Sequence, residues 1–226
     1  MSDKEAVNTE QWNANFAILM ESGVAAAYRK LMLNGSRITE LLSDKNNRIV
    51  DIGCGFGASL AYLWSRGYRN LAAIEPDVRL TKTITAHMKV DLRHCMAEKI
   101  DFPDESFDAV LIYGILHHLI GLDAYWAACD EVTRILKPGG YIFIIEPGRY
   151  WALVILEPIF RFLGLFSKTF RAYSQHMDEE RPEHHFFLKN HPKVREYLLA
   201  KGFNTIVDDY RIYTWLFTIQ KPANNA

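Results

Sequence analysis

The hydrophobic residues of this chain form two kinds of pattern, continuous runs and helical spacing, and the two patterns alternate along the middle of the sequence. Continuous apolar runs of about four to eight residues are typical of buried strands, whereas apolar residues three and four apart are typical of helices. The runs predict five strands, at 48–54, 70–76, 92–96, 108–114 and 141–147.

Helical spacing separates these runs and predicts helices at 58–67, 77–89 and 123–137. Gly67 ends the first helix, Asp77 caps the second, and the Pro-Gly-Gly sequence at 138–140 stops the third. Strands and helices that alternate with short connections are typical of a doubly wound α/β sheet with parallel strands.

Two segments lie outside this alternation. Apolar residues at helical spacing from Trp12 to Leu42, with a stop at Asn34-Gly35, predict a helical lead-in. About forty residues, 148–190, form an insertion after the fifth strand. The chain then shows a helix and two strands, expected to form a hairpin at the sheet edge, at 191–202, 205–210 and 213–220.

The composition limits the possible functions of the protein more than it limits its possible folds. The 226 residues are 49% hydrophobic, which is enough for a substantial core, and the 26 basic and 27 acidic residues form no long block of one sign. Nucleic acid is therefore a poor partner. The N-terminus lacks the layout of a secretory signal and no apolar run reaches about 18 residues, so we expect a soluble, cytoplasmic protein. Three scattered cysteines, Cys54, Cys95 and Cys129, predict neither a disulfide framework nor a zinc site.

The chemistry begins at the turn after the first strand, where Gly53, Gly55 and Gly57 follow Asp51. In such sheets ligands bind beyond the carboxyl ends of the strands, where glycines let them approach the backbone and the next helix offers free N–H groups. Glu75 ends the second strand, where a carboxylate can accept hydrogen bonds from both ribose hydroxyls of a nucleoside. The pattern predicts an adenosine-type cofactor.

Two cofactors compete for this turn. The spacing of Gly53, Gly55 and Ala58 fits the dinucleotide fingerprint, a weak signal by itself. S-adenosylmethionine (SAM) is the alternative. Asp51 distinguishes between the two cofactors, because a carboxylate repels a pyrophosphate but attracts the ammonium group of SAM. SAM is favoured, and a third interpretation is that the glycines only allow tight packing of helix on sheet.

Several motifs in a fixed order make the chain resemble the class I SAM-dependent methyltransferases of the small-molecule type. They are "VDIGCGFGASL", "IEPD", "AEKIDFPDESFDAVLIYGILHHL" and "EVTRILKPGGYIFIIEP", and the resemblance covers about residues 48–147. It implies a Rossmann-like sheet of seven strands in the order 3-2-1-4-5-7-6 with strand 7 antiparallel. It also implies SAM as methyl donor and S-adenosylhomocysteine as product.

The resemblance also implies roles for single residues. Gly53 and Gly55 would form the wall against the methionine part of SAM, in one turn with Cys54 and Gly57, and Asp51 would lie near its ammonium group. The remaining cofactor positions would be Glu75 at the ribose, Pro76 and Asp77 beside the adenine, the Ala97 N–H and Glu98 at the adenine amino group, and the Tyr113 carbonyl at the ammonium group.

One position departs from the family pattern. Family members often have an aspartate for the adenine amino group where this chain has Met96. We therefore expect Met96 either to make apolar contact with the adenine or to be an ordinary core residue.

His117 and His118 follow the fourth strand and are the candidate catalytic residues. Either ring could act as a base near neutral pH if the acceptor must lose a proton. The alternative is that one of them only packs over the cofactor. Quinone-type O-methyltransferases that resemble this region carry metal-binding glutamates where this chain has Gly114 and His117, so we expect no metal.

The lead-in and the insertion are expected to cover the acceptor. We predict one methyltransferase domain, 1–226, with an N-terminal cap at 1–45, and Tyr28 is the candidate to fold over the cofactor unless it is a core tyrosine. The apolar first half of the insertion suits a lid, a dimer contact or core, or a helix on a membrane surface. Its polar second half, with His176, His184, His185 and His191, is expected to be a solvated loop rather than a metal site.

The sequence therefore predicts a metal-independent methyltransferase, monomer or homodimer, that acts on a small apolar or aromatic acceptor, with oxygen preferred over nitrogen or carbon. A catalytically silent SAM-binding protein and, less favoured, a nicotinamide oxidoreductase remain as alternatives.

Overall fold

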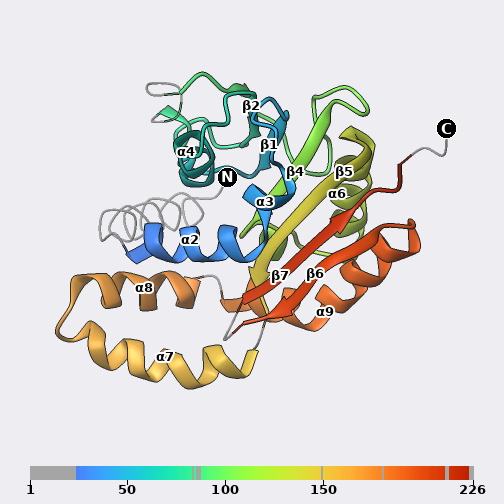
Figure 1. Cartoon of the computed structure of the whole chain (residues 1–226). Helices are drawn as coiled ribbons and strands as arrows, with labels where there is room; N and C mark the ends of the chain where they lie inside the picture. Colours follow the sequence, from blue (N-terminus) through green and yellow to red (C-terminus); the bar gives the residue numbers. More distant parts are fainter. Residues whose placement is uncertain are drawn as a thin grey trace.

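A seven-stranded sheet forms the centre of the molecule (Figure 1). The computed structural model describes residues 24–82, 84, 88–148, 150–179, 181–211 and 214–223. The strands lie in the order β3-β2-β1-β4-β5-β7-β6, as predicted; β7 is antiparallel to both neighbours and the other pairs are parallel. Their bounds are Ile49–Ile52 for β1, Leu71–Ile74 for β2, Asp91–Arg93 for β3, Phe107–Tyr113 for β4, Leu136–Pro147 for β5, Asn204–Tyr210 for β6 and Thr214–Gln220 for β7.

Helices cover both faces of this sheet. β1 and β2 are buried at every position, because each face meets apolar side chains. One face packs on α6 and α9, and the other on α2, α3 and α4. The helical bounds are Val24–Gly35 for α2, Ile38–Leu41 for α3, Ala58–Ser65 for α4, Leu116–His118 for the 3-10 turn η1, Leu122–Ile135 for α6, Tyr150–Gly164 for α7, Lys168–Glu179 for α8 and Arg181–Ala200 for α9.

Two strands, β3 and β5, have bounds that differ from the prediction. β3 begins and ends earlier than predicted, so His94 follows the strand, where its Nδ1 lies 2.9 Å from the Glu75 carbonyl oxygen. β5 starts at Leu136 and runs through the Pro-Gly-Gly sequence, which was predicted to stop the third helix and precede the strand. The reason is a partner beyond β7: Gly139 N–H donates to the Lys221 carbonyl, and Lys221 N–H donates to the Gly140 carbonyl.

The polar second half of the insertion is not the predicted solvated loop. α9 begins at Arg181, ten residues earlier than predicted, and buries His184 and His191. Pro192 inside the helix cannot donate to the Leu188 carbonyl. The His191 Nδ1 lies 3.0 Å from that oxygen and takes over this hydrogen bond, which lets the helix continue through the proline.

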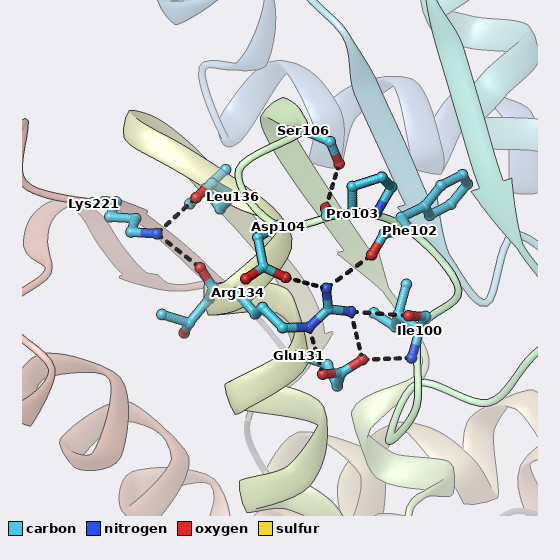
Figure 2. A network of polar contacts seen from close by, with 10 residues as sticks. Ile100, Phe102, Pro103, Asp104, Ser106, Glu131, Arg134, Leu136 and Lys221 are labelled. Atoms are coloured by element: carbon cyan, nitrogen blue, oxygen red, sulfur yellow. Dashed lines mark hydrogen bonds and ion pairs between the residues drawn. The ribbon is translucent and has the colours of Figure 1, made fainter.

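The loop between β3 and β4 is fixed by the Arg134 guanidinium (Figure 2). Arg134 donates to the carbonyls of Ile100 and Phe102 at 2.9 and 2.8 Å, and it also pairs with the carboxylates of Asp104 and Glu131. These carboxylates raise the pKa of Arg134. The network holds the segment that carries Ala97 and Glu98 in place.

The apolar first half of the insertion forms α7, which makes a helical hairpin with α8 at the bottom of Figure 1. Among the residues that the structure describes, none belongs to a helix with both the length and the apolar character needed to cross a membrane.

Candidate active site

A cavity of about 420 Å³ opens beyond the carboxyl ends of β1, β2 and β4, where ligands bind in doubly wound sheets. Its volume lies within the range of small-molecule sites. The turns after these three strands supply most of the wall, and the loop after β3 and Arg29 on α2 supply the rest.

The glycine turn after β1 is held by the Glu75 side chain. Glu75 is buried, and one carboxylate oxygen accepts the Gly55 N–H at 2.9 Å while the other accepts the Asp77 N–H at 3.0 Å. Gly55 has φ 51°, and a Cβ built on it meets no atom within 4 Å. Such a Cβ would therefore project into open space, and the glycine keeps that space for a ligand.

Asp51 lies beneath this turn and is almost completely buried. Its Oδ2 has no hydrogen-bond partner among the described residues. Burial raises the pKa of Asp51 to about 7, the Arg29 charge lowers it and the Glu75 charge raises it. A buried carboxylate that lacks a donor can attract a cationic or hydrogen-bonding ligand group, because pairing offsets the cost of burying the charge.

Most of the residues predicted at the site lie together in this cavity. The lining residues that were predicted are Asp51, Gly53, Cys54, Gly55, Glu75, Pro76, Met96, Ala97, Glu98, Tyr113, His117 and His118. Gly57 and Asp77 are not among the lining residues: a Cβ on Gly57 would meet Ile84 at 2.4 Å, and the Asp77 carboxylate pairs with Arg79. The side chain of Tyr28 lies outside what the structure describes.

Met96 is not a core residue, because it is 53% exposed. It lies on the cavity wall, and its contact with the adenine stays a prediction. Next to it, Glu98 has a buried Oε2 without a hydrogen-bond partner among the described residues. Ala97, between them, is buried.

His117 is held by a buried carboxylate from the neighbouring strand. The His117 Nδ1 lies 2.7 Å from Glu146 Oε2, and Glu146 Oε1 accepts the N–H groups of Ile115 and Leu116 at 2.8 and 2.7 Å. An ionised carboxylate can only accept, so Nδ1 carries the proton and Nε2 is the basic nitrogen of the ring. The contact fixes both the tautomer and the orientation of His117.

His118 has a carboxylate partner from a distant part of the chain. The His118 Nδ1 lies 2.7 Å from Glu183 Oε2 on α9, and both side chains are about one third exposed. The His117 ring also lies against His118 and His184, with centroid distances of 4.1 and 4.5 Å. α9 therefore supports both histidines of η1.

Residues 50–144 match the family described as "Methyltransferase domain". Residues 50–144 therefore form a methyltransferase domain. This confirms the family expected from the sequence motifs. The match covers the glycine turn and the sheet as far as β5, and it ends before Glu146.

Curated relatives of this methyltransferase domain include proteins of quinone biosynthesis. The chain is 30% identical over 148 residues to the ubiquinone biosynthesis O-methyltransferase of Rhodopseudomonas palustris (strain TIE-1), an alignment that covers 61% of this chain and 55% of that protein. It is 27% identical over 161 residues to the ubiquinone/menaquinone biosynthesis C-methyltransferase of Chromobacterium violaceum, which covers 66% and 59% of the two chains. The chain thus matches only somewhat more than half the length of these relatives.

Solved structures share the fold of the methyltransferase domain. A putative SAM-dependent methyltransferase from Methanococcus maripaludis superposes with a TM-score of 0.60 at 15% identity, covering 95% of this chain and 94% of that chain. The 1,6-didemethyltoxoflavin-N1-methyltransferase of Burkholderia thailandensis, solved with its acceptor and S-adenosylhomocysteine, gives 0.58 at 16% identity and covers 98% and 91%.

Sequence reasoning missed the partners of the methyltransferase site. Arg29 was not predicted, yet its guanidinium carbon lies 4.5 Å from the Tyr113 ring centroid and it lines the cavity. Glu146 and Glu183 were read only as part of a strand and of a polar loop. In the described part of the chain, no group of three or more His, Cys, Asp and Glu side chains is arranged to hold a metal ion.

Proposed function

We propose that this chain methylates a small apolar or aromatic molecule with SAM as donor, preferably on an oxygen atom. The observation that carries the proposal is the meeting of Asp51, Glu75 and the open space at Gly55 in one cavity. An unpartnered buried carboxylate, a ribose-type acceptor and a bare backbone match the ammonium, ribose and methionine parts of SAM.

Different residues bind different parts of the cofactor. Asp51 binds the ammonium group, and Glu75 accepts from the ribose hydroxyls while it keeps the glycine turn in shape. Met96, Ala97 and Glu98 enclose the adenine. When bound, SAM supplies a methyl group on a positively charged sulfur.

His117 is the general base. An acceptor hydroxyl gives its proton to His117 Nε2 as its oxygen takes the methyl group, and Glu146 stabilises the resulting imidazolium through the Nδ1 contact of 2.7 Å. A base of this kind is needed for phenol-type acceptors, and the names of the R. palustris and C. violaceum relatives point to quinone precursors. Methylation of a ring carbon also follows loss of a phenol proton, so carbon is the second candidate.

Two measurements test the proposal. Calorimetry should show binding of SAM and S-adenosylhomocysteine but not of NADH. Labelled methyl from SAM should then appear in a phenolic metabolite, and NMR of the product distinguishes an O-methyl from a C-methyl group. Binding of SAM without transfer to any member of a phenol and quinol panel would favour a silent SAM-binding protein, and tight NADH binding would contradict the cofactor assignment.

A further inference from the structure

The outer face of the α7–α8 hairpin exposes a continuous apolar stripe. Ile155, Ile159 and Phe162 follow one another at the spacing of a single face of α7, and Leu165 and Phe166 lie just beyond its end in the turn. Leu165 and Phe166 are 67% and 78% exposed. Exposed apolar side chains gathered on one surface indicate an interaction site, whereas scattered ones do not.

The hairpin has a defined shape, so this exposure is not the result of a loose end. On its inner side the rings of Phe160 and Phe170 stack with centroids 5.7 Å apart and join the two helices. The turn is closed by hydrogen bonds from Phe166 N–H and Ser167 N–H to the Leu163 carbonyl. None of the residues that line the cavity comes from the described side chains of α7 and α8.

The charges around the stripe indicate what covers it. The hairpin has three basic residues, Arg161, Lys168 and Arg171, and three acidic ones, Glu157, Asp178 and Glu179. The basic residues lie nearer to the turn in the chain than the acidic ones, so the positive charge is concentrated around Leu165 and Phe166. All three basic residues are exposed, and Arg161 pairs with Asp178. A symmetric dimer through this face would bring the basic groups of two copies together, which is unfavourable.

We propose that the α7–α8 hairpin docks on the surface of an anionic lipid bilayer. Phe162, Leu165 and Phe166 enter the boundary between head groups and acyl chains, and the basic side chains contact the lipid phosphates. An apolar face flanked by basic residues is the combination that binds such surfaces without crossing them.

The base of the hairpin lies close in the chain to the histidine end of the cavity. α7 begins four residues after Glu146, and Glu183 lies four residues beyond the end of α8, so both carboxylates that hold the η1 histidines lie next to the hairpin in the chain. If the proposed function holds, an acceptor dissolved in the bilayer reaches the cavity from this end.

Vesicle flotation tests the proposal with the full chain. Wild type should float with vesicles of phosphatidylcholine and phosphatidylglycerol and much less with pure phosphatidylcholine. The double variant Leu165→Glu/Phe166→Glu should bind at least about tenfold more weakly, and Lys168→Gln about fivefold more weakly to the anionic vesicles only. Val78→Glu, an equally drastic change at an exposed apolar residue outside the hairpin, should bind like wild type.

The result of the vesicle experiment can be interpreted whether or not the proposed function is correct. Stabilisation by S-adenosylhomocysteine in the double variant, equal to that of wild type, shows that the variant is folded whatever the acceptor is. The proposal is overturned if wild type does not float with anionic vesicles, or if the double variant floats with them as well as wild type does. If wild type forms a dimer and does not bind vesicles, and the double variant is a monomer, the stripe is instead a contact with a second copy of the chain.

Discussion

Asp51 in β1 and Glu146 in β5 are both buried carboxylates of the same sheet, yet their surroundings differ. Glu146 accepts two backbone N–H groups and the His117 ring, whereas Asp51 Oδ2 has no partner among the described residues. Burying a carboxylate is costly unless donors compensate it. The satisfied carboxylate is therefore suited to hold a neighbour in place, and the unsatisfied one is suited to receive a ligand.

The largest effect should come from the residue that Glu146 holds. His117→Ala should lower turnover by about 10²- to 10⁴-fold while SAM affinity stays near that of wild type, because the variant loses a base and not a cofactor contact. His118→Ala is the matched control, because its partner Glu183 is exposed and its contribution to the site is smaller. Calorimetry and steady-state kinetics measure both; equal losses in the two variants would contradict the assignment of the base.

On the Asp51 side, Glu75→Ala should weaken SAM binding by about 1.5 to 3 kcal/mol, because it removes a charged acceptor. The structure adds a second cause, since the Gly55 and Asp77 N–H groups lose their partner as well. Calorimetric titration measures the change. A folded variant with unchanged affinity would remove Glu75 from the ribose site.

Changing Glu146 should affect catalysis and leave the cofactor in place. In Glu146→Gln the side-chain oxygen can still accept hydrogen bonds from the backbone N–H groups. It no longer offers His117 Nδ1–H a negative charge, so turnover should fall about 10- to 100-fold. Glu183→Gln is the comparison at the exposed pair and should have little effect. The pH profile of turnover provides the second reading, because a purely structural role for Glu146 would leave the shape of that profile unchanged.

Much of the Asp51 side could be predicted from the sequence, because its residues are close together in the chain. Asp51 lies in β1, and the glycine turn and Glu75 follow β1 and β2, whose apolar runs are easily recognised; a parallel sheet brings the ends of these strands together. Met96 was ambiguous only because a methionine fits a core and a ligand wall equally well.

The Glu146 side was much harder to predict, because its contacts join distant segments. Glu183 lies 65 residues from His118, and its helix was hidden by Pro192, which usually marks a break. The His191 contact with the Leu188 carbonyl satisfies the oxygen that Pro192 cannot reach, and the sequence alone does not show this contact. Arg29 gave no signal either, since an arginine on an amphipathic helix is ordinarily solvated.

The smallest effect, and the most direct contrast, is expected from Asp51→Asn. Burial raises the pKa of Asp51 to about 7, above its ordinary value in the unfolded chain. Between about pH 4 and 7 the ligand-free folded protein therefore holds a proton that the unfolded chain has lost, and its stability falls as the pH rises through this window. Above pH 7 the wild type carries a buried, poorly compensated charge.

Asp51→Asn removes that charge, so at pH 8 the ligand-free variant should melt a few degrees higher than wild type, by roughly 2 to 4 °C per kcal/mol gained, and at pH 5 the difference should shrink. Glu146→Gln should instead melt lower at both values. SAM affinity of the wild type should fall by about tenfold from pH 8 to pH 6 as Asp51 is protonated. The Asn variant controls for titration of SAM itself; if its affinity changes with pH as much as that of wild type, Asp51 is not the ammonium ligand.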